Sequence, residues 1–381
     1  MKQVMVTKFL PLPANSGGKQ RSLAILRRLA AQGEVTLCAF DDGSADRAAL
    51  RALGVDVRSV PWTPARGRGL EGVVRTGTLS AGRFWERRLA RHVRSAVAAG
   101  DTRVLQVEYA QLAPYLSIGP AGLRVLDLHN VESSLASSYA RDADVVRGAL
   151  ARVESVALRR LEAWAVGVAD VVSVVSEHDR DRLPRPPRRL LVCPNGWEPG
   201  VPLPPAPEPV AAFVGLMSWR PNQDAARWLV EKIWPRVVQR VPDARLLLVG
   251  RDPGPALRRL SGPAVEVTGS VEEVRPHLAR ARVALAPLRS GGGTRLKILE
   301  AMDAGRPVVA TTIGAEGLES LAGDGLRIAD EPEAIAREIA ALLLDPARAA
   351  ALGRRGSAAV AARYSWDRTL SPLLDHLAGA R

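Results

Sequence analysis

The sequence predicts an α/β protein made of two doubly wound domains, each with a parallel β-sheet covered by helices. Short apolar segments alternate with helical patterns along the chain, which is typical of strand–helix–strand units. A proline-rich segment at 199–209 divides this alternation into two series. The 381 residues, 47% of them hydrophobic, are enough for two domains with a core each. We expect the two domains, joined by the proline-rich segment, to face a cleft. In such sheets ligands bind outside the carboxyl ends of the strands.

The first series occupies residues 1–198, which we assign to an N-terminal domain. Its apolar runs are short and bounded by polar or glycine-containing segments, as buried strands are. The expected strands are Gln3–Thr7, Val35–Phe40, Val55–Val60, Val104–Val107, Val125–Leu128 and Val171–Val175. Helical patterns lie between them and include Gln20–Gln32, Arg83–Ala98 and Val145–Val168.

The segment 199–209 reads PGVPLPPAPEP and is predicted to be a linker, because proline continues neither a helix nor a central strand. The second series gives a C-terminal domain at 210–365. We expect the last residues, 366–381, to form a helix that crosses back to the N-terminal domain. The expected strands are Ala211–Val214, Arg245–Val249, Val265–Thr268, Val283–Ala286 and Val308–Ala310, with helices at Ala225–Val238, Val274–Ala281, Lys297–Ala304 and Glu333–Leu344.

Positive charge is concentrated in one part of the chain. The formal net charge is +13, and residues 51–100 hold ten Arg against three acidic residues. In the helix predicted at 83–97, an apolar residue recurs at every fourth position, at Trp85, Leu89, Val93 and Val97. This stripe with its basic flank either lies on an anionic membrane or packs on the sheet. Nucleic acid is not an expected partner, because aromatic content is 4% and no recognition module is present.

The sequence also bears on the compartment. Cys38 and Cys193 stand in apolar runs and are predicted to be buried thiols in a reducing environment. The N-terminal apolar stretch is broken by Pro11 and Pro13, unlike a signal peptide. No run approaches the ~18 apolar residues that a membrane span needs. We therefore expect a soluble, cytoplasmic protein, free or in peripheral contact with the inner face of the cell membrane.

A glycine pair, Gly17-Gly18, follows the first strand and precedes a helix. Glycine lets the backbone approach a ligand closely, and the amides at a helix start bind anions. The loop is not a P-loop, because Pro13 and Gln20 occupy positions where that motif needs Gly and Ser or Thr. It is either a phosphate-binding loop or a plain turn between a strand and a helix.

A second glycine-rich segment, 284–311, carries the strongest chemical pattern. Three glycines, at 291–293, stand between a strand and a helix, where backbone amides and the helix dipole favour a negative charge. Basic side chains follow, and a carboxylate one to two turns into the helix can accept the hydroxyls of a ribose. The pattern predicts a nucleotide diphosphate site, against the alternative of a capped helix with solvated charges. The candidate binding residues are Gly292, Gly293, Thr294, Arg295, Leu296 and Glu300, with Lys297 as a cation beside them.

The chain resembles the family 4 retaining glycosyltransferases, also described as glycosyl transferases group 1, which have the GT-B fold of two Rossmann-like domains. The resemblance covers nearly the whole chain, in order, and the ordered set is specific although each match alone is weak. The matching segments are Lys2–Lys8 with Gly17-Gly18, Leu126–Asn130, Ala169–Ser176, Pro194–Gly196, Phe213–Gly215, Leu248–Gly250, Thr268–Ser270 and the 284–311 segment.

The resemblance implies retaining, metal-independent transfer of a hexosyl group from a UDP- or GDP-linked sugar. It implies no cofactor beyond this co-substrate, and an acceptor of unknown identity (a cell-surface glycan, a glycolipid or a natural product) bound by the N-terminal domain. In this family Glu300 would bind the ribose and His129 would contact the donor sugar. Arg220, shortly after Gly215, is the nearest candidate for the family's Lys that neutralises the diphosphate, and Arg295 or Lys297 would compensate for the family's missing Arg.

Two positions depart from the family pattern. Gly292 stands where members usually carry a Glu that contacts the donor sugar, and Leu216 stands where they carry an Arg. These departures keep open the alternative of a non-catalytic scaffold that retains the fold. A third alternative, a dehydrogenase, would need the G-x-G-x-x-G fingerprint, which no strand–helix turn of the sequence has.

Overall fold

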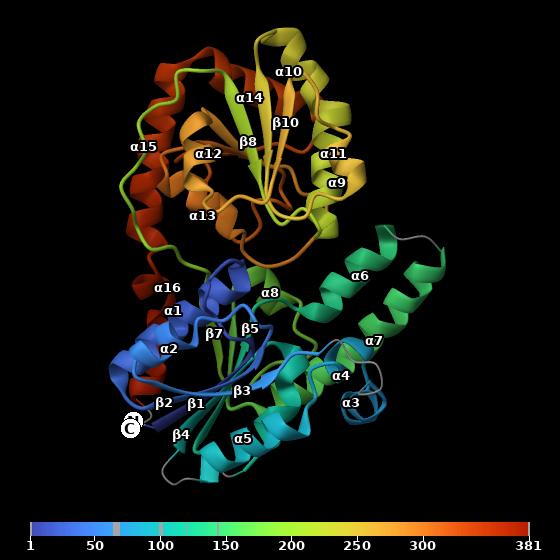
Figure 1. Cartoon of the computed structure of the whole chain (residues 1–381), viewed down its shortest axis with the longest axis vertical. Helices are drawn as coiled ribbons and strands as arrows, with labels where there is room; N and C mark the ends of the chain where they lie inside the picture. The colour runs from blue at the N-terminus through green and yellow to red at the C-terminus, as the bar shows by residue number, and fades with distance from the viewer. Residues whose placement is uncertain (1, 64–68, 99–101, 120, 143–144, 380–381) are drawn as a thin grey trace. The chain divides into compact units, whose positions relative to one another are not determined.

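The computed structural model describes residues 2–63, 69–98, 102–119, 121–142 and 145–379. The chain divides into two compact units (Figure 1). The first unit contains Met1–Pro194 and Leu370–Arg381, and the second contains Asn195–Thr369. Helix α16 (Trp366–Gly379) therefore starts in the second unit and ends in the first. Both units are α/β, so the predicted fold class of two parallel-sheet domains is confirmed.

The sheet of the first unit has seven parallel strands in the order β3-β2-β1-β4-β5-β6-β7. The six expected strands are present, and the seventh, β7, follows them. Their order places β4 in the middle, between β1 and β5, so the carboxyl ends of these three strands lie side by side. The strands are β1 (Lys2–Phe9), β2 (Val35–Asp41), β3 (Val55–Pro61), β4 (Thr102–Glu108), β5 (Leu123–Leu128), β6 (Val171–Val174) and β7 (Leu190–Val192).

Helices cover both faces of this sheet. Val4 and Val6 of β1 point into a core that also holds buried residues of α5 and α7. Thr7 points the other way, because side chains alternate along a strand, and its hydroxyl lies 3.2 Å from that of Ser22 in α1. The helices are α1 (Gly17–Gln32), α2 (Arg47–Ala52), α3 (Gly69–Thr76), α4 (Leu79–Gly82), α5 (Arg87–Ala98), η1 (Ala110–Ser117), α6 (Glu132–Asp142), α7 (Val145–Val168) and α8 (Glu177–Asp181).

The basic helix differs from the sequence expectation in two ways. It begins at Arg87, because Arg83 ends the preceding helix α4. Its stripe packs against the sheet: Leu89 and Val93 are fully buried, and Trp85 and Val97 are nearly so. The proposed membrane contact through this stripe is therefore wrong, because the sheet already covers the apolar side chains that would have to enter the lipid.

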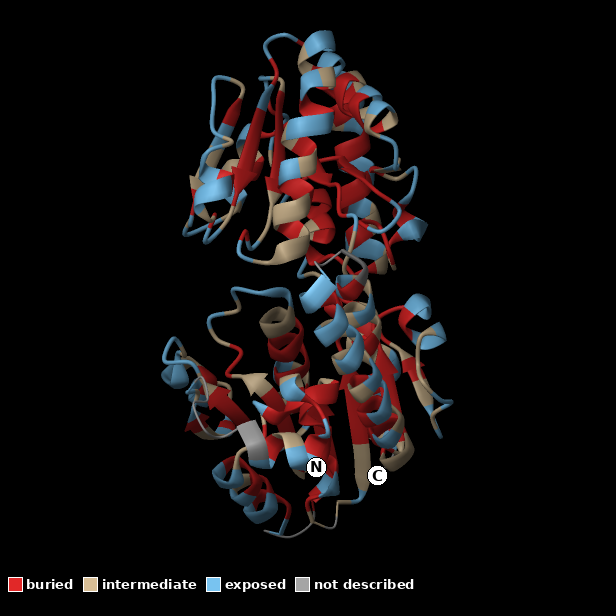
Figure 2. Ribbon diagram, turned by 90° about the vertical axis from the view of Figure 1, so that its right-hand side faces the viewer, coloured by how far each residue is buried: buried red, intermediate tan, exposed pale blue. Residues whose placement is uncertain are grey.

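The second unit has six parallel strands in the order β10-β9-β8-β11-β12-β13. Buried side chains lie on both faces of the sheet. Figure 2 colours most of its strand residues red, as buried. The five expected strands are present, with β13 in addition. They are β8 (Val210–Val214), β9 (Arg245–Val249), β10 (Val265–Gly269), β11 (Val283–Ala286), β12 (Val308–Ala310) and β13 (Leu326–Ile328).

The helix expected at Ala225–Val238 starts earlier and is not uniform. A π-helical turn interrupts it just before Pro235, which has no backbone N–H to continue the α-helical hydrogen bonds. The helices of this unit are α9 (Arg220–Trp228), η2 (Leu229–Ile233, the π-helical turn), α10 (Trp234–Arg240), α11 (Pro255–Arg258), α12 (Arg275–Arg280), α13 (Leu296–Asp303), η3 (Glu319–Leu321), α14 (Pro332–Leu344) and α15 (Pro346–Arg363).

Both cysteines are free and buried, as expected. Burial raises the pKa of Cys38 to about 12, which keeps this thiol protonated and unreactive. Within the described residues, no helix combines the length and the apolar character that crossing a bilayer requires.

Candidate active site

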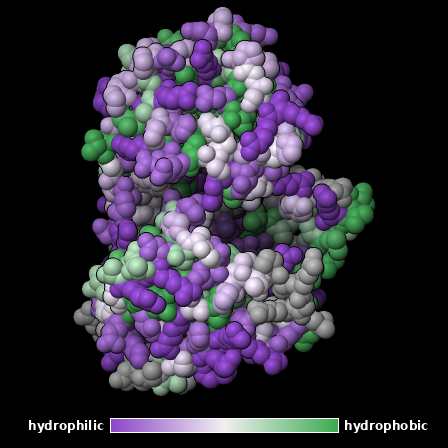
Figure 3. Space-filling view, in the orientation of Figure 1, coloured by the Kyte–Doolittle hydropathy of each residue, from purple (hydrophilic) through white to green (hydrophobic). Residues whose placement is uncertain are grey.

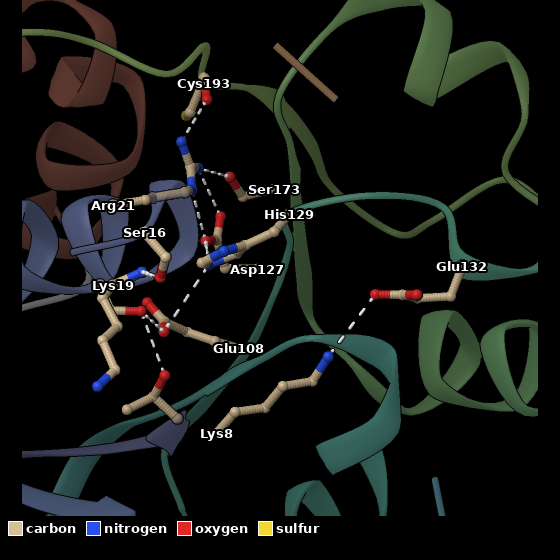
Figure 4. A network of polar contacts seen from close by, with 12 residues as sticks. Lys8, Ser16, Lys19, Arg21, Glu108, Asp127, His129, Glu132, Ser173 and Cys193 are labelled. Carbon is tan, nitrogen blue, oxygen red and sulfur yellow. Dashed lines mark hydrogen bonds and ion pairs between the residues drawn. The ribbon is translucent and has the colours of Figure 1, made fainter. Parts of the chain in front are cut away.

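Polar side chains gather at the carboxyl edge of the first sheet (Figure 4). Glu108 ends β4, Asp127 lies in β5, and His129 follows β5 directly. Arg21 reaches them from α1. Strands β1, β4 and β5 are adjacent and parallel, so residues distant in the sequence meet at this edge. The arrangement confirms the sequence expectation that His129 stands where a strand ends.

Arg21 and Asp127 form a buried, bidentate ion pair. The guanidinium donates to the two carboxylate oxygens at 2.9 and 2.7 Å, and their side chains are 1% and 0% exposed. A third N–H donates to the carbonyl of Cys193 at 2.9 Å. Burial disfavours the charged form of both groups, but their mutual attraction outweighs this effect. It holds the pKa of Asp127 far below its usual range and raises the pKa of Arg21 above its usual value. Both groups therefore stay charged.

The same carboxylates surround His129. Its Nε2 lies 3.3 Å from Asp127 and 3.8 Å from Glu108. Glu108 also accepts a hydrogen bond of 2.5 Å from the Ser22 hydroxyl. Burial alone would lower the pKa of His129, but the two nearby carboxylates outweigh it and raise the pKa. With Nε2 toward the carboxylates, the protonated ring has Nδ1 as a donor on the side of Gly18.

Tyr109 explains why Gly18 is a glycine. A Cβ atom on Gly18 would lie 2.2 Å from the Tyr109 hydroxyl oxygen. Tyr109 itself adopts a φ of 68°, a strained conformation for a residue with a side chain. Its ring centroid lies 3.9 Å from that of His129, and Lys8 Nζ lies 4.1 Å from the tyrosine ring centroid. The glycine thus makes room for a protein side chain, and anion binding by Gly17-Gly18 stays a prediction.

A metal ion was not expected, yet ligand atoms of Glu108, Asp127 and His129 lie within 4.8 Å of one another. The neighbouring charges argue against a cation at this place. Arg21 already donates to both oxygens of Asp127, and its guanidinium would repel a metal ion. The arrangement suits a protonated imidazole better than a metal centre.

In the second unit, Lys297 is the central cation. Its ammonium donates to the side-chain oxygen of Asn222 at 2.8 Å and lies 4.6 Å from the ring centroid of Phe213. A Cβ atom on Gly215 would lie 2.6 Å from Asn222 Nδ2 and 2.9 Å from Lys297 Nζ. Gly215 is therefore required for this pair to approach the end of β8. Nothing in the local sequence pattern marked Asn222 as part of the site.

The glycine-rich turn before α13 is held by Arg295. Gly291 and Gly293 have φ of 122° and 74°, which favour glycine. Arg295 is 6% exposed, and its guanidinium donates to the carbonyl of Gly292. The carbonyl of Thr294 accepts from the Asn195 side chain at 3.3 Å. The turn is thus a fixed backbone structure, as an anion-binding loop needs to be.

Glu300 and Lys297 stand one turn apart on α13, and both have shifted pKa values. Burial raises the pKa of Glu300 to about 7, although Lys297 opposes the shift. Burial and the nearby Arg295 lower the pKa of Lys297 to about 7. A half-buried acid and a half-buried base with pKa values near neutral are typical of a functional site that binds a charged ligand.

The structure places the predicted residues in two groups. Gly17, Gly18 and His129 lie in the first unit, and the others lie in the second. Arg220 is the first residue of α9, but the side chain that contacts Lys297 is Asn222, two residues later. The Leu296 side chain is buried, so only its backbone can face a ligand. The sequence analysis did not identify three residues of these groups: Tyr109, Arg21 and Asn222. Tyr109 directly follows a strand, as His129 does, and this position could have marked it as a candidate.

Residues 208–345, which include the glycine turn, Lys297 and Glu300, match the family described as glycosyl transferases group 1. This confirms the resemblance drawn from the motifs. The protein is a glycosyltransferase. It is 28% identical, over 314 residues, to a GDP-mannose-dependent α-(1-6)-phosphatidylinositol monomannoside mannosyltransferase of Mycolicibacterium smegmatis; the match covers 74% of this chain and 78% of the relative.

Comparison with solved structures confirms the expected fold of this glycosyltransferase. Its structure is similar to sucrose-phosphate synthase from Thermosynechococcus elongatus, with a TM-score of 0.76, 19% identity and full coverage of both chains. It is also similar to Anabaena HepE crystallised with UDP-glucose, with a TM-score of 0.69, 14% identity and full coverage of both. At these identities the likeness establishes the GT-B fold.

Proposed function

We propose that this glycosyltransferase transfers a hexosyl group from a nucleotide diphosphate sugar, with retention at the anomeric carbon and without a metal ion. The observation that carries the proposal is the pair on α13. Lys297 is a half-buried cation held by Asn222 beside Gly215, and Glu300 is a half-buried carboxylate one turn away. The Lys297 ammonium can neutralise the charge of a diphosphate. The carboxylate oxygens of Glu300 can accept hydrogen bonds from the hydroxyls of the adjoining ribose.

In this proposal, the bond between the anomeric carbon and the diphosphate breaks as the acceptor hydroxyl attacks. Negative charge then grows on the diphosphate. Lys297, Arg295 and the amides of the glycine turn are fixed before the reaction, so they stabilise this charge without reorganisation. The role of His129 at the donor sugar comes from the resemblance. The carboxylates that raise its pKa favour the protonated ring, in which Nδ1 can donate to a sugar oxygen.

GDP-mannose is the donor that we propose first, because the curated relatives that match include several GDP-mannose-dependent mannosyltransferases. Those relatives are named for phosphatidylinositol monomannosides, so a glycolipid is the acceptor that we propose. We further propose that the enzyme acts in the cytoplasm, where buried free thiols such as Cys38 and Cys193 stay reduced.

The proposed function is tested with a panel of nucleotide sugars, by measuring their slow hydrolysis without acceptor in buffer that contains EDTA. GDP-mannose should be consumed at least as fast as UDP-glucose. Glu300→Ala and His129→Ala should each lower the turnover by about a hundredfold or more, because each removes a contact made to the donor. The melting temperature should show that both variants remain folded.

Matched controls separate these site residues from other residues of the same type. Glu273→Ala and His178→Ala replace exposed residues outside the site and should leave turnover unchanged. Near-normal turnover in both Glu300→Ala and His129→Ala would contradict the site assignment. Loss of activity in EDTA that Mg²⁺ restores would contradict metal independence.

Binding of GDP-mannose should change the protonation of the second unit, with a sign that reverses near neutral pH. Above pH 7, Lys297 is mostly neutral in the free enzyme, and the diphosphate should make it take up a proton. Below pH 7, Glu300 is mostly protonated, and binding to the ribose hydroxyls should make it release one. Calorimetric titrations at pH 8 and pH 6, in buffers of different ionisation enthalpy, measure this exchange.

Two variants assign each half of this exchange. Lys297→Met should abolish proton uptake at pH 8, and Glu300→Gln should abolish proton release at pH 6. GDP-mannose is a suitable ligand because its diphosphate is esterified at both ends. Proton exchange that survives in both variants would show that other groups titrate on binding.

A further inference from the structure

Helix α7 carries a largely apolar ridge, most of which is exposed among the residues that the structure describes. Val146, Leu150 and Val153 are 70%, 62% and 69% exposed. They continue through Ala157 and Arg160 to Trp164, at intervals of four, three, four, three and four residues, so all six share one face of the helix. We call these six residues the α7 ridge; it is about 27 Å long. Figure 3 shows hydrophobic side chains where Figure 1 places the end of the α6–α7 pair.

The rest of α7 shows that this exposure is specific to one face. Leu158, Leu161 and Val166 are at most 6% exposed and belong to the core or line it. Val145 and Val156, beside the ridge, are also exposed, at 89% and 54%. Single exposed apolar residues are ordinary, but a contiguous row of large ones indicates a surface that binds a partner.

The exposed charged side chains that the structure describes on α7 are arginines. Arg152, Arg159 and Arg160 are exposed on α7. The acidic residues of the helix are engaged elsewhere: Glu154 accepts from the backbone amides of Leu79 and Ser80 at 3.0 and 2.8 Å, and Glu162 is buried against Ser133. The ridge therefore presents apolar side chains flanked by cations.

A cavity of about 370 Å³ lies at the C-terminal end of the α7 ridge. Arg75 of α3 and Arg160 line it, together with Trp164, Leu161 and the backbone of Gly77. Trp164 is 42% exposed, and tryptophan is enriched at the boundary between membrane and water. Arg75 also stacks on Trp85, with its guanidinium carbon 4.1 Å from the ring centroid. Two arginines beside apolar lining residues suit the phosphate of a lipid whose chains lie along the ridge.

We propose that the α7 ridge binds the surface of an anionic membrane, with its valine and leucine side chains at the headgroup boundary and a lipid phosphate between Arg75 and Arg160. The charge pattern selects this partner over a second copy of the chain, because two copies facing each other would bring the same arginines together. The surface is separate from α5, whose apolar stripe is buried, and it does not depend on the proposed transfer chemistry.

The test is flotation of the full-length protein with vesicles of phosphatidylcholine alone and with phosphatidylglycerol added. Wild type should float with the anionic vesicles and less with the neutral ones. Leu150→Asp should reduce the bound fraction on anionic vesicles at least about tenfold, because it places a charge in the apolar contact. Arg160→Gln should weaken binding to anionic vesicles and reduce its dependence on salt.

Leu344→Asp is the matched control, since Leu344 is 63% exposed and lies in the second unit. It should bind vesicles like wild type, and melting curves should show that all variants fold. Equal loss in Leu150→Asp and Leu344→Asp, or no preference of wild type for anionic vesicles, would overturn the proposal. So would a dimer in solution that Leu150→Asp dissociates in the absence of vesicle binding, which would assign the ridge to a second copy.

Discussion

Lys297→Met should lower kcat/KM for the nucleotide sugar by about a thousandfold, the upper range for loss of one fixed group that stabilises transition-state charge. Methionine fills the space of the lysine stem but carries no charge. Asn222 and the ring of Phe213 contact the ammonium and fix its position. No other cation that the structure describes makes these two contacts. Arg295 remains in the variant, but its guanidinium is engaged with the glycine turn. Steady-state kinetics with the best donor of the panel measures the effect.

Lys232→Met is the control for this prediction, because Lys232 is exposed on the π-helical turn η2. It should keep the wild-type kcat/KM. Asn222→Ala should lie between the two variants, since it leaves the ammonium in place without its side-chain partner. A kcat/KM for Lys297→Met within tenfold of wild type would remove Lys297 from the site.

Arg21→Met should destabilise the first unit by about 3–5 kcal/mol, the usual cost of breaking a buried ion pair by removing one partner. Asp127 would then be a buried carboxylate without its bidentate donor. The free energy of unfolding, from urea titration, measures the loss. Arg27→Met, on the exposed side of the same helix, should change it little.

Two further measurements identify the ion pair as the cause. The pairing lowers the pKa of Asp127, so its stabilisation is present above the unfolded-state pKa and is lost as pH falls through the folded-state value. In Arg21→Met burial raises the pKa of the unpaired Asp127, so this carboxyl can become protonated as pH falls. The deficit of the variant should therefore be larger at pH 7 than at pH 4. The double variant Arg21→Met/Asp127→Asn should recover part of the stability, because no buried charge is left unpaired. An unchanged deficit in the double variant would mean that packing, and not charge, holds Arg21.

The sequence alone determined most strands of both sheets, β7 and β13 excepted, and the pair on α13. Strand and helix patterns depend on neighbours along the chain, so their periodicity is visible without a structure. Lys297 and Glu300 are three residues apart on one helix, and their common face follows from helical geometry. The break in the helix at Pro235 is equally local, although it was not predicted.

Tertiary structure decided which side chains meet at the sheet edge and which apolar faces stay exposed. Arg21 pairs with Asp127 across 106 residues, and Tyr109 meets Gly18, only because parallel strands bring their ends together. Helices α5 and α7 both carry an apolar stripe in the sequence. The sheet covers the stripe of α5, while the ridge of α7 extends beyond it, because burial depends on where a helix lies over the sheet, and no local pattern contains that position.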